Sequence, residues 1–208
     1  MFDFSTLLTF VVVVLGLFLI PGPAVLLTAT RTIQGGRKAG VLAGAGIATG
    51  DLIHTLCSAA GLSAILMTSA LAFNFVKYAG AAYLLYLGIR AMLEKPAAPQ
   101  AAKPSPATTS SAYWQAIFIE VLNPKTALFF LAFLPQFVHP ERGDSFLQIL
   151  TLGLIFVLLS ILYTTGIAMS VRLLAGFIKR VSWISRWSGK AVGAIYISLG
   201  LKVAVESR

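Results

Sequence analysis

The chain has 208 residues, of which 58% are hydrophobic and 11% charged, and its mean hydropathy is +0.87. Soluble globular domains carry about 25% charged residues, so this composition excludes an ordinary soluble protein. No apolar stretch alternates strictly as a barrel strand does, and we therefore predict an all-α integral membrane protein. The net charge of +9 would suit a nucleic-acid binder, but the positions of the basic residues follow membrane topology, and no nucleic-acid partner is expected.

Six apolar stretches predict transmembrane helices, at about residues 5–30, 39–67, 71–92, 114–138, 146–170 and 188–205. Between the third and the fourth, a segment rich in Pro and Ala predicts a flexible cytoplasmic linker at residues 94–112. The linker separates a first three-helix repeat at residues 1–93 from a second at residues 113–208. Because each repeat has an odd number of helices, the second enters the membrane inverted, which is the 3+3 inverted-repeat plan of many transporters.

The first predicted helix is interrupted by Pro21, Gly22 and Pro23. Proline removes a backbone donor and clashes with the preceding turn, so the helix unwinds here. Unwound backbone at membrane depth is tolerated where it is buried in protein or lines a cavity. The three residues are therefore candidate substrate-binding residues, with a simple kink as the alternative.

A second interruption, Asn123-Pro124-Lys125, lies in the fourth predicted helix, 101 residues after the first. Interrupted helices at matching positions of two halves indicate a transporter binding site. The backbone N–H groups at the start of a half-helix favour an anion such as an α-carboxylate. We therefore expect Asn123, Pro124 and Lys125 to bind substrate as well.

Ionisable residues lie near the middle of two apolar helices: Asp51 and His54 in the second, Glu120 and Lys125 in the fourth. A charge at a helix centre costs ~2.5–3.5 kcal/mol on insertion scales, so such residues usually face a cavity or a partner. We expect the four to couple protons or form ion pairs, with Asp51–Lys125 as a pair that substrate or a proton opens. Purely structural roles for Asp51 and His54, and a solvated Glu120 near the cytoplasmic face, are the alternatives.

The fifth predicted helix carries Ser160, Tyr163 and Thr164 on one face. They could line the same cavity, but hydroxyl side chains in such helices usually bond their own backbone, so we expect them mainly to pack. Two histidines and one cysteine at scattered positions predict no metal site, and the chain shows no catalytic motif and no phosphate loop. We expect neither an enzyme nor a cofactor.

The second helix also carries two GxxxG spacings, Gly40 to Gly44 and Gly46 to Gly50. Small residues at this spacing let helices approach closely. They fit internal packing or a homodimer equally well.

The predicted topology places eleven of the sixteen basic residues on one side of the membrane and four on the other, with Lys125 inside the fourth helix. Cytoplasmic loops carry the excess of Lys and Arg. Both termini are therefore expected on the non-cytoplasmic side.

The chain resembles the LysE/RhtB family of bacterial amino-acid exporters. The resemblance rests on Pro21-Gly22-Pro23, Gly50-Asp51, Asn123-Pro124-Lys125 and Leu134-Pro135-Gln136-Phe137, and it covers nearly the whole chain. It implies export of amino acids or close derivatives across the bacterial inner membrane, driven by the proton motive force. A substrate amino acid, protons and membrane lipid are then the expected partners.

Taken together, the sequence predicts a six-helix inner-membrane exporter that alternates access around a site at the two helix breaks. Efflux of a cation or another small metabolite through the same architecture is one alternative. A non-transporting membrane scaffold is another.

Overall fold

The computed structural model describes residues 2–19, 22–68 and 109–178, with isolated helical positions between 75 and 93 and between 190 and 201. Every element of regular structure in these ranges is helical, so the predicted all-helical class is confirmed for them. Pro21, the linker up to residue 108 and most of the predicted third and sixth helices lie outside the described residues. The six-helix count and the 3+3 repeat therefore stay predictions.

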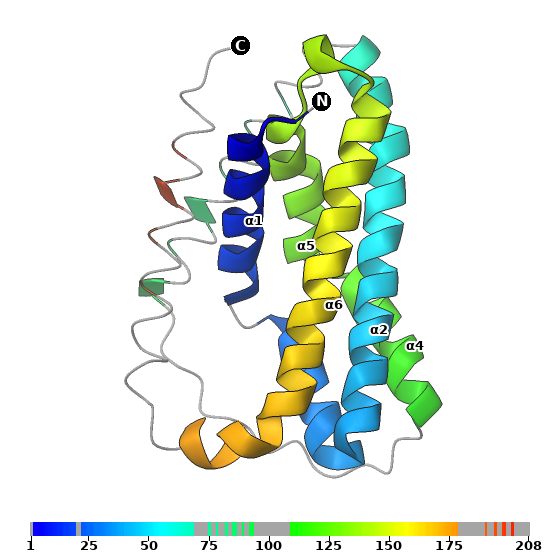
Figure 1. Ribbon diagram of the computed structural model, residues 1–208, viewed down its shortest axis with the longest axis vertical. Coiled ribbons are helices and arrows are strands. Elements are labelled where there is room, and N and C mark those ends of the chain that lie inside the picture. Colours follow the sequence, from blue (N-terminus) through cyan, green and yellow to red (C-terminus); the bar gives the residue numbers. More distant parts are fainter. Residues whose placement is uncertain are drawn as a thin grey trace.

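The first helix is broken where the sequence predicts. Helix α1 (Phe4–Leu19) ends before the Pro-Gly-Pro motif, and α2 (Pro23–Thr68) begins with its second proline. Within α2, Gly36 has φ 79° and ψ −179°, a conformation that favours glycine. It divides α2 into two arms, residues 23–35 and 37–68, which run in opposite directions (Figure 1). The two arms thus belong to the first and second predicted helices.

The second broken helix is built from several short pieces. Helix α4 (Thr109–Val121) is followed by α5 (Pro124–Leu128), the π-helix η1 (Phe129–Phe133) and the 3-10 helix η2 (Leu134–Phe137). The bend between the two halves is 44°. The chain runs from α4 to η2 in the direction opposite to α1 (Figure 1). Because α4 begins at Thr109, the last four residues of the predicted linker 94–112 are helical.

A long helix, α6 (Ser145–Ile178), follows the short 3-10 helix η3 (Pro140–Arg142) and packs along α2, which packs in turn on α4 (Figure 1). Within the described ranges, Pro23–Leu62 and Ser145–Ser170 are long and apolar enough to cross a membrane. The bent pair Ser111–Val121 and Pro124–Phe137 adds a third candidate span if it is counted as one.

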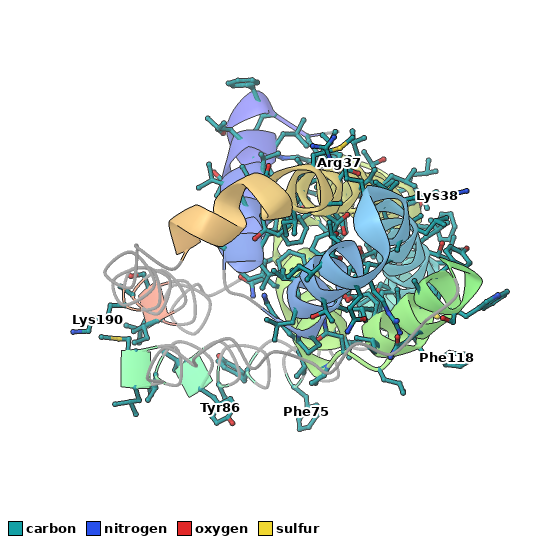
Figure 2. The ribbon with its side chains drawn as sticks, turned by 90° about the horizontal axis from the view of Figure 1, so that it is seen from below. Arg37, Lys38, Phe75, Tyr86, Phe118 and Lys190 are labelled. Carbon is teal, nitrogen blue, oxygen red and sulfur yellow. The ribbon has the colours of Figure 1, made fainter. Side chains whose placement is uncertain are left out.

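The outer surface of these helices is apolar. Helix α1 exposes one face, consisting of Phe4, Leu8, Val12, Leu15 and Leu19. On α4, Phe118 is 64% exposed and points away from the other helices (Figure 2). Apolar patches of this extent mark a membrane or protein contact. These faces suit contact with lipid tails, and Arg37 and Lys38 project at the Gly36 turn (Figure 2).

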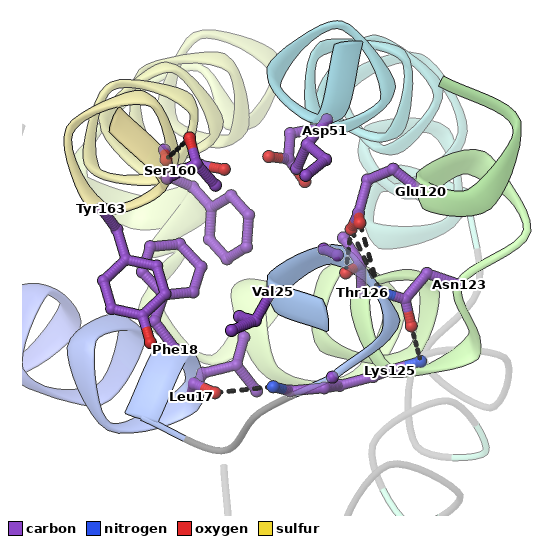
Figure 3. A pocket seen from close by; sticks show the side chains of 15 residues that line it. Leu17, Phe18, Val25, Asp51, Glu120, Asn123, Lys125, Thr126, Ser160 and Tyr163 are labelled. Carbon is purple, nitrogen blue, oxygen red and sulfur yellow. Dashed lines mark hydrogen bonds between the residues drawn. The ribbon is translucent and has the colours of Figure 1, made fainter. Parts of the chain in front are cut away.

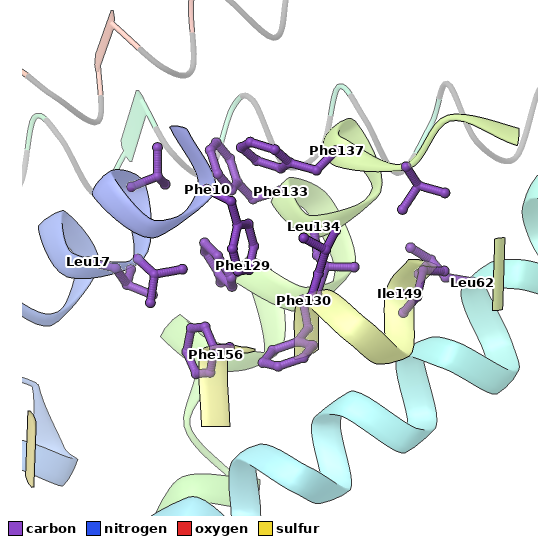
Figure 4. Close-up of a cluster of buried hydrophobic side chains, with 14 of the residues drawn as sticks. Phe10, Leu17, Leu62, Phe129, Phe130, Phe133, Leu134, Phe137, Ile149 and Phe156 are labelled. Atoms are coloured by element: carbon purple, nitrogen blue, oxygen red, sulfur yellow. The ribbon is translucent and has the colours of Figure 1, made fainter. Parts of the chain in front are cut away.

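A cluster of buried phenylalanines fills the space between α1, α6 and the pieces that follow α5 (Figure 4). Phe10 meets Phe137 edge to face, with ring centroids 5.2 Å apart, and Phe129 lies 5.1 Å from Phe156. Aromatic pairs of this geometry add ~0.5–1.5 kcal/mol beyond their buried area. The cluster therefore fixes α1 against the second broken helix on one side of the break.

The start of α1 is tied to the loop that carries η3. Oδ1 of Asp3 accepts a hydrogen bond from the Thr6 backbone N–H at 2.9 Å, and Oδ2 accepts one from Arg142 Nη1 at 3.1 Å. The hydrogen bonds from Thr6, together with the one from Arg142, hold the pKa of the Asp3 carboxyl well below its usual range. Asp3 therefore caps the helix as a carboxylate.

Both GxxxG spacings of α2 serve internal contacts. A Cβ at Gly46 would overlap the backbone carbonyl oxygen of Tyr113 on α4, and one at Gly50 would lie 2.6 Å from Glu120 Cβ. Gly44 faces Thr164 of α6 in the same way, and a Cβ at Gly40 would overlap the Thr32 side chain on the first arm of α2 and lie 3.0 Å from Ala168 Cβ on α6. Of the two uses that the sequence left open, the described helices show close packing within one chain.

We expect Gly46→Ala to destabilise the protein by ~1–3 kcal/mol, because α4 would have to move away from α2. The matched control is Gly166→Ala, since nothing lies within 4 Å of a Cβ placed there. Alanine is the better helix former, so the control is expected to be neutral or slightly stabilising. Thermal unfolding in detergent measures both variants, and equal midpoints would contradict the close approach of the two helices.

Candidate functional site

A cavity lies where the two broken helices meet α2 and α6 (Figure 3). It contains about 420 Å³ of empty space, including the part that opens to the surroundings. Its lining consists of Leu17, Phe18, Gly22, Ala24, Val25, Ile47, Asp51, Glu120, Asn123, Lys125, Thr126, Phe156, Ser160, Tyr163 and Thr164.

Asn123 makes the second break. Its side-chain oxygen accepts a hydrogen bond from the Lys125 backbone N–H at 3.1 Å, so it is the N-cap of α5. Pro124 occupies the first turn, where a missing N–H costs nothing. Nδ2 of Asn123 donates to both carboxyl oxygens of Glu120, at 3.2 and 3.3 Å. The Asn-Pro pair thus starts the new half-helix and positions an acid beside it.

Glu120 is 2% exposed, which excludes the solvated position that the sequence left open. Besides the two bonds from Asn123, its Oε1 accepts a hydrogen bond from the Thr126 hydroxyl. Three hydrogen bonds from two side chains therefore converge on one buried carboxyl group. No sequence motif marked Thr126, although a hydroxyl residue three positions after an N-cap asparagine lies close enough along the chain to reach the same carboxyl group.

Asp51 is 1% exposed and points into the cavity from α2 (Figure 3). Its Oδ2 is buried and has no hydrogen-bond partner. The Glu120 carboxyl and the Ser160 hydroxyl are its polar neighbours. Glu120 is the charged neighbour of both Asp51 and Lys125, and the Asp51–Lys125 ion pair stays a prediction.

Lys125 reaches from the second break to the first. Its Nζ donates a hydrogen bond to the Leu17 carbonyl oxygen at 2.7 Å (Figure 3). Leu17 lies in the last turn of α1, where backbone carbonyls lack helical partners and a cation is favourable. A Cβ built at Gly22 would lie 3.8 Å from the same Nζ, so the ammonium also lies close to Gly22 of the first break. Within the cavity, Glu120 is the acidic residue that interacts electrostatically with the Lys125 ammonium.

The remaining wall is apolar and largely aromatic. The Phe18 ring stacks on Tyr163 at 5.3 Å between centroids and meets Phe156 edge to face at 5.2 Å. Val25 and Ile47 complete the wall. No sequence motif marked Phe18, Phe156, Val25 or Ile47, because apolar residues are the common background of a membrane helix.

The three polar residues of α6 that we expected mainly to pack all line the cavity. The hydroxyl of Thr164 bonds the Ser160 carbonyl oxygen at 2.7 Å, as the expectation of backbone bonding requires. Ser160 and Tyr163 instead present their side chains near Asp51 and Phe18, respectively. Tertiary packing brings them there.

The other predicted site residues lie around the cavity without lining it. His54 Nε2 lies 3.1 Å from the Glu120 backbone oxygen, and its ring stacks on Phe130 at 5.8 Å. Pro23 and Pro124 begin their helices but are absent from the lining, and Pro21 lies outside the described residues. The described residues contain no group of three His, Cys, Asp or Glu side chains able to hold a metal ion.

Comparison with known proteins agrees with this architecture. The family model described as LysE type translocator matches residues 15–207. The chain is 32% identical over 204 residues to an uncharacterised membrane protein of Pseudomonas aeruginosa, covering 96% of this chain and 94% of that protein. It is 31% identical over 188 residues to a homoserine/homoserine lactone efflux protein of Salmonella typhimurium, covering 90% of each. A Salmonella typhi protein of the same name is 30% identical, with the same coverage. No solved structure matches the chain. The family match covers most of the sequence, and the chain therefore belongs to the LysE type translocator family.

Proposed function

We propose that this protein exports amino acids or close derivatives across the bacterial inner membrane. As a member of a translocator family it is a membrane transporter and not an enzyme. The observation that supports the substrate class is the cavity, which has two carboxyl groups on one wall and the Lys125 ammonium on another. The names of the two Salmonella relatives, which refer to efflux of homoserine and its lactone, agree with this class.

The arrangement of charges suits a zwitterion. The unpartnered Oδ2 of Asp51 is a ready acceptor for an α-ammonium group. Lys125 would bind the α-carboxylate together with the first backbone N–H groups of α2, at Ala24 and Val25, since all three residues line the cavity. Glu120 already occupies the start of α5 at the second break, where it adds a second carboxyl group to the side of the cavity that contains Asp51. The two breaks therefore bind different ends of the substrate: the first binds the α-carboxylate, and the α-ammonium lies beside the two acids.

The two buried carboxyls also suggest how protons enter the cycle. Like charges at close range in a low dielectric repel strongly, so a proton or a substrate ammonium must compensate the pair. Lys125 from the second break, Tyr163 from α6 and His54 one turn along α2 are the other titratable groups around the pair. We propose that a proton and the ammonium compete for Asp51 and Glu120, which couples export to the proton motive force.

Alternating access would follow from the two broken helices. They run in opposite directions and meet at the cavity, as expected if the chain has a 3+3 inverted repeat whose halves rock about a central site. The N-terminus and the η3 loop lie at one end of the molecule and the Gly36 turn, with Arg37 and Lys38, at the other (Figure 1). The basic end would be cytoplasmic, leaving both termini on the opposite side.

We expect Asp51→Asn and Glu120→Gln each to lower pH-gradient-driven amino-acid flux in proteoliposomes by about tenfold or more. The basis is the loss of a charged hydrogen-bonding partner, worth ~1.5–3 kcal/mol. Wild type should also bind amino acids more weakly as the pH falls, because protons and ammonium compete, and Asp51→Asn should lose this dependence.

The matched control is Glu141→Gln, an acid-to-amide change on the exposed η3, which should transport like wild type. Unchanged coupled flux in both cavity variants would refute the proposed proton site. Stabilisation by a cation, without any by amino acids, would instead favour the cation-efflux alternative. A folded protein that transports neither amino acids nor a cation would favour the alternative of a non-transporting membrane scaffold.

Lys125→Met should weaken homoserine binding by about tenfold or more but leave homoserine lactone binding nearly unchanged. The lactone has no free carboxylate, so it does not use the contact that the substitution removes. Competition against a transported amino acid measures both ligands, with Lys38→Met at the exposed Gly36 turn as the control. Equal losses for the two ligands would show that Lys125 supports the helix break and does not bind the carboxylate.

A further inference from the structure

We infer that the cavity selects amino acids whose side chains are apolar, and the inference rests on the proposed export function. The relatives named for homoserine efflux suggest a hydroxylic side chain. The lining of this cavity, considered group by group, points to an aliphatic or aromatic one.

Most neutral polar groups in the lining are already engaged within the protein. Asn123 uses its oxygen on the Lys125 N–H and its nitrogen on Glu120. The Thr126 hydroxyl donates to Glu120, and the Thr164 hydroxyl donates to the Ser160 carbonyl. These three side chains therefore offer little to a polar side chain of the cargo.

The charged groups of the lining are the ones proposed above to bind the two ends of an amino acid. Asp51, with Ser160 beside it, faces the position proposed for the ammonium, and Lys125 faces the one proposed for the carboxylate. The hydroxyl of Tyr163 points toward α1 and away from Asp51 (Figure 3). Its ring, stacked on Phe18, is the part that faces the other aromatic residues.

An amino acid bound at these two positions by its ammonium and carboxylate groups would therefore direct its side chain toward an apolar wall. Phe18 and Phe156 form one side of this wall, and Val25, Ile47 and Leu17 form the rest. A hydroxyl buried against such a wall loses its water without gaining a partner, whereas a methyl group gains contacts. Apolar side chains should be favoured, and hydroxylic ones should be penalised.

The test uses ligands that differ only in this group. Norvaline and homoserine have side chains of nearly equal size, ending in a methyl and a hydroxyl group, and valine and threonine form a second such pair. Each is offered as a competitor for flux of labelled leucine into proteoliposomes holding the full-length protein. We expect the apolar member of each pair to compete about tenfold or more better.

A variant localises the preference. Val25→Thr replaces a methyl group of the wall by a hydroxyl at nearly constant volume and should move the norvaline-to-homoserine ratio toward homoserine by several-fold. Val41→Thr, outside the cavity lining on the second arm of α2, is the matched control and should leave the ratio unchanged. A ratio that Val25→Thr does not move would overturn the assignment of this wall.

The two proposals fail differently. If homoserine and threonine compete as well as or better than their apolar partners, the side-chain inference is wrong while amino-acid export stands. If no amino acid is transported or competes, although the protein remains folded in detergent, the export proposal fails and the inference fails with it.

Discussion

The hydrogen bond from Lys125 Nζ to the Leu17 carbonyl is the contact on which the cavity depends. Two helix breaks, each with unsatisfied backbone groups, could not remain in a membrane separately. Lys125 belongs to the second break and satisfies a carbonyl at the first, so the same side chain stabilises α1 and closes one side of the cavity. The phenylalanine cluster formed by Phe10, Phe129, Phe130, Phe133, Phe137 and Phe156 then holds α1 against the second broken helix.

The two breaks differ in a way that follows from Glu120. In an ordinary half-helix the first N–H groups are available to an anion. Here a carboxyl from the preceding turn is held beside the start of α5 by Asn123 and Thr126. A second carboxyl group of the protein therefore lies beside Asp51, and two acids together form this wall of the cavity. This asymmetry underlies the proposal that the ammonium and the carboxylate of the cargo lie at different breaks.

Close packing of helices makes this polar interior possible. Gly46 and Gly50 bring α4 so near to α2 that Glu120 lies directly against the α2 backbone, one residue from Asp51. Gly44 brings α6 close to α2 at Thr164, and Ser160 and Thr164 line the same cavity. Apolar residues meanwhile cover the outer faces of α1, α4 and α6, so that polar groups turn inward and apolar groups turn outward. The arrangement suits a lipid environment and a water-accessible centre.

The sequence by itself determined the helical membrane class, the two breaks and the buried charges, because these depend on local composition: long apolar runs, proline without an N–H, and ionisable residues that cannot face lipid. It also identified five residues that do line the cavity, Gly22, Asp51, Glu120, Asn123 and Lys125. Only the tertiary structure decided which charges meet. It placed Glu120 beside Asp51, brought His54 to the Glu120 backbone, and assembled the aromatic wall from Phe18, Phe156 and Tyr163. Pairings of this kind depend on helix rotation and crossing, and hydrophobic residues that fill a membrane helix give no signal of which face turns toward a cavity.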